Sequence, residues 1–181
     1  MFIAKRLCSL VSVVVLLLMP FAVSADDSER RAVMVPDAGT YSRTIATDVP
    51  EAQQFFDQGL RLAWGFYFPE SIASYQEASR LDPGSPMPYW GIAHAAGPNP
   101  NSRYARMPDD PQGAGLAAIE AAIDRIDRAT PIEAKLIRAM HVLYDAKSIP
   151  DPRERDQAYL AAMRSLNTEY PDDPDITALY A

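Results

Sequence analysis

Apolar residues recur at three- and four-residue steps after residue 50, which is the period of an amphipathic α-helix. The first apolar stripe consists of Ala52, Phe55, Phe56, Gly59, Leu62 and Ala63. A break at residues 65–69 precedes a second stripe, which consists of Ile72, Tyr75, Ala78 and Leu81. The Asp-Pro-Gly-Ser-Pro run at 82–86 ends it, because proline and glycine do not continue a helix. The pattern predicts two helices joined by a short turn.

Further helices are expected downstream. One starts near Pro86 and ends at the Gly-Pro-Asn-Pro-Asn run 97–101, residues 102–112 form a loop, and a helix follows over 116–126. Thr130, Pro131 and Glu133 have the spacing of a capping box at the start of the next helix. Another helix is centred on 159–166, and a last one begins near Ile176. No alternating strand pattern appears, so the chain is predicted to be all-α, with about seven helices in antiparallel pairs.

Residues 52–85 fit one repeat unit of a helix-pair architecture. Large, small and helix-ending residues occupy regular positions in it, namely Phe55, Gly59, Leu62, Tyr75, Ala78 and Pro83. Small residues let two helices approach closely, aromatic residues fill the space beside them, and proline ends the second helix. In this pattern the unit resembles the tetratricopeptide repeat (TPR). The resemblance is strong over about 45 residues and looser over about 120, and it implies a short α-solenoid over residues 51–181.

A narrower resemblance is to a group of exported bacterial TPR proteins. It rests on the segment 52–60, on Met-Pro-Tyr-Trp-Gly-Ile-Ala at 87–93, on Gly-Pro-Asn at 97–99 and on Tyr-Pro-Asp-Asp-Pro at 170–174. Members of that group are usually longer, which implies that this chain is the N-terminal part of a longer array or a truncated product. The apolar end 176–181 is also a poor solenoid cap.

The first 25 residues have the order of a secretory signal peptide, with Lys5 and Arg6 before the apolar run 7–19 and small residues up to Ala25. An apolar run of 13 residues is short for a bilayer span. An uncleaved anchor is the alternative, and a lipoprotein fits less well because Cys8 precedes the apolar run. Residues 26–50 are predicted to form an extended arm or linker. The mature protein is therefore expected to have no membrane span and to be exported, to the periplasm or by secretion.

Removal of the leader changes the charge and the cysteine count. Lysine and arginine fall from 17 to 15 against 24 acidic residues, which gives a net charge of −9, and no cysteine remains. A thiol nucleophile, a disulfide framework and a cysteine zinc site are thereby excluded. Without a basic patch, nucleic acid is not an expected partner.

The residues that could carry catalysis are few. His94 and His141 stand alone in their helices, except that Asp145 lies four residues after His141. The acid pairs 109–110 and 172–173 lie between prolines, where turn and helix-cap roles are expected rather than calcium binding. No nucleophile, phosphate-binding or metal-binding motif is present. The sequence therefore predicts no enzyme, no cofactor and no metal.

The frame of the repeat predicts a partner groove on the concave face, lined by first helices of the pairs. The residues expected there are Gln53, Phe56, Leu60, Ala63, Met87, Trp90 and His94. The resemblance places Phe56 and Leu60 where TPR proteins that bind a C-terminal carboxylate carry polar residues, so an apolar peptide or helix is the expected ligand. The alternative hypotheses are the N-terminal fragment of a longer enzyme or metal-dependent protein, and a module that self-associates through its last helix.

Overall fold

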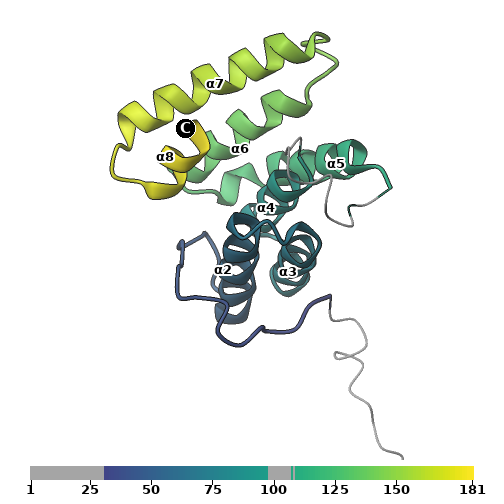
Figure 1. Cartoon of the computed structure of the whole chain (residues 1–181), viewed down its shortest axis with the longest axis vertical. Coiled ribbons are helices and arrows are strands. Elements are labelled where there is room, and N and C mark those ends of the chain that lie inside the picture. The colour runs from purple at the N-terminus through teal and green to yellow at the C-terminus, as the bar shows by residue number, and fades with distance from the viewer. Residues whose placement is uncertain (1–30, 98–106, 108) are drawn as a thin grey trace, which may run out of the picture.

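The computed structural model describes residues 31–97, 107 and 109–181, and the described part is all-helical (Figure 1). It contains α2 (Pro50–Trp64), α3 (Phe68–Leu81), α4 (Met87–Ala96), α5 (Pro111–Ile123), the 3₁₀ helix η2 (Ile126–Arg128), α6 (Pro131–Tyr144), α7 (Pro152–Glu169) and α8 (Pro174–Tyr180). The expected leader 1–25 and most of the expected loop after Gly97 lie outside the described residues.

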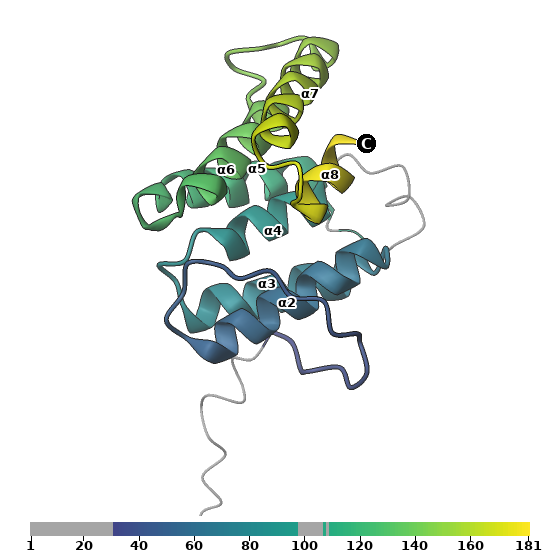
Figure 2. The same cartoon turned by 90° about the vertical axis from the view of Figure 1, so that its left-hand side faces the viewer.

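Consecutive helices pack as pairs and the pairs stack. Helix α2 packs on α3, α4 on α5 and α6 on α7, while α3 also contacts α4 and α5 contacts α6. The first helices of neighbouring pairs touch as well, α2 with α4 and α4 with α6, and α8 packs on α7. The stack rises from α2 and α3 at one end to α6 and α7 at the other (Figures 1 and 2). The predicted all-α, solenoid-like architecture with seven α-helices is confirmed for the described residues.

Helix starts follow local chemistry. The predicted capping box is present, because Thr130 Oγ1 accepts the Glu133 N–H and the Glu133 carboxylate accepts the Thr130 N–H at 2.7 Å. The expected start of the next helix upstream, at residue 116, is wrong. Helix α5 begins at Pro111, where Asp110 caps it by accepting the Gly113 N–H and proline suits the first turn. It also ends at Ile123, three residues before the expected end.

The first helix pair is built around Tyr75, which is fully buried. A Cβ atom at Gly59 of α2 would lie 2.7 Å from the Tyr75 ring, and one at Gly91 of α4 would lie 2.5 Å from it. The ring therefore fills a space that only glycine leaves open on both sides. Phe55 and Ala78 are also fully buried, Leu62 is half-buried, and Pro83 follows the end of α3 at the surface.

Among the described helices, none combines the length and the apolar character that crossing a bilayer requires.

Candidate functional site

Residues 31–49, which we call the arm, run along α2 without forming a helix or a strand (Figure 2). At the start of the arm, Gln58 of α2 binds the backbone at two points, accepting the Val35 N–H at 2.7 Å and donating to the Val33 carbonyl at 3.0 Å. Asp37 and Gly39 then adopt positive φ angles of 59° and 90°. This left-handed backbone belongs to a turn, from which residues 41–47 continue along another side of α2.

Residues 41–47 are held through their backbone by helix side chains. Gln53 of α2 donates to the Arg43 carbonyl at 2.9 Å and accepts the Ile45 N–H at 3.0 Å. Asp57, one turn later on α2, accepts the Arg43 N–H at 3.0 Å. Glu133, at the start of α6, accepts the Ala46 N–H at 2.8 Å. The segment has no β-sheet partner for its backbone. Side chains of two helices form hydrogen bonds with its backbone N–H and carbonyl groups instead.

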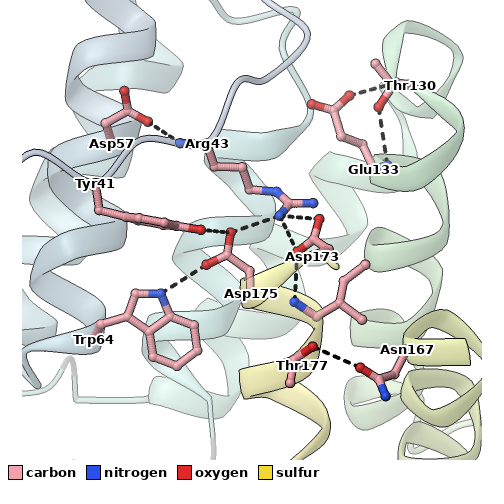
Figure 3. A network of polar contacts seen from close by, with 11 residues as sticks. Tyr41, Arg43, Asp57, Trp64, Thr130, Glu133, Asn167, Asp173, Asp175 and Thr177 are labelled. Carbon is pink, nitrogen blue, oxygen red and sulfur yellow. Dashed lines mark hydrogen bonds and ion pairs between the residues drawn. The ribbon is translucent and has the colours of Figure 1, made fainter. Parts of the chain in front are cut away.

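Arg43 joins this segment to the last helix (Figure 3). Its Nη1 atom lies 2.9 Å from carboxylate oxygens of both Asp173 and Asp175, at the start of α8. Asp175 also accepts hydrogen bonds from the Tyr41 hydroxyl at 2.9 Å and from the Trp64 indole at 3.3 Å. We call the surface that holds residues 41–47 the arm face. It consists of Gln53, Asp57 and Arg61 of α2, Asp82 at the end of α3, Glu133 of α6, and Asp173 and Asp175 of α8.

The electrostatics of the arm face follow from this arrangement. Burial alone would raise the pKa of Asp173, but hydrogen bonds from Arg43 and the Ile176 N–H keep it below its usual value. Burial, followed by the hydrogen bond to Asp175, raises the pKa of Tyr41 to about 12. Asp173 is therefore charged at neutral pH, and Arg43 supplies the cation that Asp173 and Asp175 both contact.

The predicted groove residues do not line an open groove, and this expectation is wrong. Phe56, Leu60, Ala63, Met87 and Trp90 are each at most 3% exposed and belong to the buried core. Ile45 of the arm and Ile176 of α8 belong to the same apolar cluster. The repeat pattern predicts which helix face these residues share, and that face was expected to be open to a partner. In the structure, the arm and α8 pack on it. Of the seven residues, Gln53 is the one whose polar side chain contacts the arm.

His94 is held between two tryptophans. Its ring stacks on Trp90 at 5.3 Å between centroids and lies 5.7 Å from the Trp64 ring. Burial lowers the pKa of His94 to about 4, and the charge of Asp175 opposes this shift only in part. The imidazole is therefore neutral at pH 7. Its buried Nδ1 atom has no hydrogen-bond partner in the described part of the chain.

The acid pairs have the cap roles expected of them at two positions. Asp110 caps α5 and Asp173 caps α8, the latter by accepting the Ile176 N–H at 3.0 Å. Asp145, expected to share a helix face with His141, accepts the Ser148 N–H at 2.9 Å. Within residues 31–97, 107 and 109–181, no group of three or more histidine and acidic side chains could hold a metal ion.

Two apolar pockets lie away from the contacts of residues 41–47. One, of about 430 Å³, lies between α6 and α7, and an ion pair between Lys135 and Glu169 stands at its edge. The other, of about 210 Å³, lies where Val33 and Val35 of the arm meet Leu62 of α2. Both are lined mainly by aliphatic carbon, and neither brings together groups suited to catalysis.

Sequence reasoning missed most of the arm face. Tyr41 was assigned to a linker, and Arg43, Asp57 and Asp175 were not singled out. The contacts of Arg43 reach 130 and 132 positions along the chain. No periodicity or motif signals a contact of that separation.

The chain matches no protein-family model, no curated protein and no solved structure. Functional inference therefore rests on the arm face itself.

Proposed function

We propose that this protein is a binding scaffold that holds an extended segment of another protein on the arm face, and that it is not an enzyme. The observation that carries the proposal is the way Gln53, Asp57 and Glu133 bind the backbone of residues 43–46. Contacts to backbone groups do not depend on the side chains of the segment that is held. The same polar groups are therefore suited to an extended segment of another chain.

The resemblance to TPR proteins supports the same function, because stacked helix pairs serve as scaffolds for protein recognition. It also supports export, and we propose the periplasm as the site of action. The proposal differs from the sequence-based hypothesis in the chemistry of the ligand. The arm face contains five acidic side chains beside Gln53 and one arginine, Arg61, so an extended polar segment fits it better than an apolar helix does.

The test compares two neighbouring glutamines of α2. Three forms of the purified chain are immobilised and exposed to an extract of the bacterial envelope, namely Arg43→Ala alone, with Gln53→Ala added and with Gln54→Ala added. Arg43→Ala loosens the arm in all three, because it removes the contacts with α8. Gln53 contacts the arm, whereas Gln54 is exposed and serves as the matched control. A partner that binds Arg43→Ala and its combination with Gln54→Ala, but is lost when Gln53→Ala is added, supports the proposal. Retention by all three proteins would mean that the partner uses another surface, and absence of any partner would argue against a scaffold.

Trp90→Ala and Phe56→Ala are unsuitable as binding controls. Both side chains are buried in the core, and truncation of such aromatic residues typically costs 3–5 kcal/mol of stability. Loss of a partner in these variants would report unfolding.

A further inference from the structure

Residues 41–47 lie among acidic side chains from four helices. Five carboxylates each hydrogen-bond to this segment, namely Asp57 of α2, Asp82 at the end of α3, Glu133 of α6, and Asp173 and Asp175 of α8. Asp57, Glu133 and Asp175 are themselves buried, with at most 8% exposure. Arg128 forms an ion pair with Asp82, and Arg61 donates to the Tyr41 carbonyl. A segment that occupies this surface therefore meets five carboxylates against two fixed cations, which is a net negative environment.

Arg43 neutralises part of that negative charge, at the start of α8. Asp173 and Asp175 both contact its Nη1 atom, and the side chain of Asp175 is only 4% exposed. Without a cation between them, two carboxylates would lie close together with little solvation, which is unfavourable. An occupant of the arm face must bring a cation to this position, and the planar guanidinium of arginine suits a pair of carboxylates.

Ile45 is the second determinant. It is 5% exposed and joins the apolar cluster that contains Phe56 and Trp90. In an extended chain, residues i and i+2 point to the same side. Arg43 and Ile45 are directed into the molecule in this way, whereas Ser42 and Thr44 are exposed. The pattern that the arm face accepts is thus arginine, any residue, then an aliphatic residue.

We infer that residues 41–47 act as an internal ligand, and that the arm face binds a partner segment with the same arginine-x-aliphatic pattern in their place. This inference rests on the proposed function and specifies its ligand. The arm is joined to α2 through only Asp48 and Val49, so its effective concentration at the arm face is on the order of millimolar or higher. A partner segment binds only the fraction of molecules whose arm is released, which weakens its apparent affinity.

The experiment uses a labelled peptide copied from residues 40–48, with fluorescence anisotropy as the readout. It is titrated into the wild type, into Arg43→Ala, which loosens the arm but leaves the acidic residues, and into Arg43→Ala with Gln53→Ala. A matched peptide carries glutamine at the position of Arg43. We expect Arg43→Ala to bind the copied peptide at least about tenfold more tightly than the wild type does, because the competing arm is weakened. We expect the glutamine peptide and the double variant each to bind at least about tenfold more weakly.

Ile45→Ala is the second arm-loosening variant, and it replaces Arg43→Ala if circular dichroism shows that the latter is unfolded. Equal affinity for the arginine and glutamine peptides would overturn the inference about the ligand, while the proposed function would stand. Equal binding by wild type and arm variants would also overturn it, since the peptide would then occupy another surface. No binding to a folded variant, with the arm shown to be released by chymotryptic cleavage after Tyr41, would overturn both. A dimer of the wild type in light scattering, dissociated by the peptide, would assign the arm face to a second copy of this chain instead.

Discussion

Gln53→Ala isolates the contribution of the arm face to holding the arm. The substitution removes both hydrogen bonds between Gln53 and the arm, to the Arg43 carbonyl at 2.9 Å and from the Ile45 N–H at 3.0 Å, together with one to Asp57 of the same helix. A hydrogen bond in a folded protein contributes about 1 kcal/mol net, so docking of the arm should weaken by about 2 kcal/mol. Because each 1.4 kcal/mol changes an equilibrium tenfold, the open population of the arm should rise about 30-fold.

Amide hydrogen exchange measured by NMR reports that population directly. The Ala46 amide, whose acceptor Glu133 is unchanged by the substitution, should exchange about 30-fold faster in Gln53→Ala, while the amide of Ile137, in the core of α6, should change little. Gln54→Ala is the control, because it removes an exposed glutamine from the next position of the same helix. If the Ala46 amide exchanges at the wild-type rate in Gln53→Ala, then Gln53 does not hold the arm, and the physical basis of the proposed binding face is lost. Acceleration of the Ala46 and Ile137 amides by the same factor would also refute the reasoning, since the arm would then open only when the whole protein unfolds.

Three further predictions test the packing around the arm face. Phe66, two residues after the end of α2, has a positive φ of 63° and is 57% exposed. Phe66→Gly should therefore relieve backbone strain and stabilise the protein by about 1 kcal/mol in urea unfolding. Gly91→Ala should destabilise the protein by about 1–3 kcal/mol in the same assay, because the new Cβ would meet the buried Tyr75 ring at 2.5 Å. A gain in stability, from the higher helix propensity of alanine, would contradict this packing. The pKa of His94 is about 4 in the folded state against about 6.5 unfolded, so the unfolded chain binds the proton first and stability should fall as pH drops from about 6.5 to 4. Thermal unfolding should show this decline flattened in His94→Gln, and an unchanged slope would mean that His94 is not the group responsible.

Local features were predictable from the sequence because their causes are local. The capping box at Thr130 and Glu133 needs residues three apart on one helix start, and the stripe through Phe55 and Gly59 needs only helical periodicity. Helix α5 was predicted to start too late because its first turn contains proline and glycine, which also occur in loops. Asp110 could have located the start, since an acidic residue directly before proline is a common helix cap.

The arm face could not be predicted, because its determinants are dispersed and its polarity depends on tertiary contacts. Gln53 was placed on the correct helix face by its position in the repeat, but the apolar residues beside it were interpreted as exposed. A repeat frame gives the direction in which a side chain points, and it does not say which other segment covers that side chain. Arg43 lies in a segment without periodicity, so neither its burial nor its contacts with α8 leave a signal in the sequence.

The contacts of Arg43 also link the two ends of the described stack. The arm precedes the first helix pair, whereas Asp173 and Asp175 begin the last helix, and the same guanidinium contacts both carboxylates. Helix α8 has seven residues, too few to be stable without tertiary packing. Its stability therefore depends partly on the occupant of the arm face, in addition to its contacts with α7. A partner segment that supplies an arginine would preserve the position of α8, whereas one that lacks the cation would displace the arm and leave two carboxylates facing each other. Selection for arginine thus follows from the stability of α8 as well as from direct contact with the ligand.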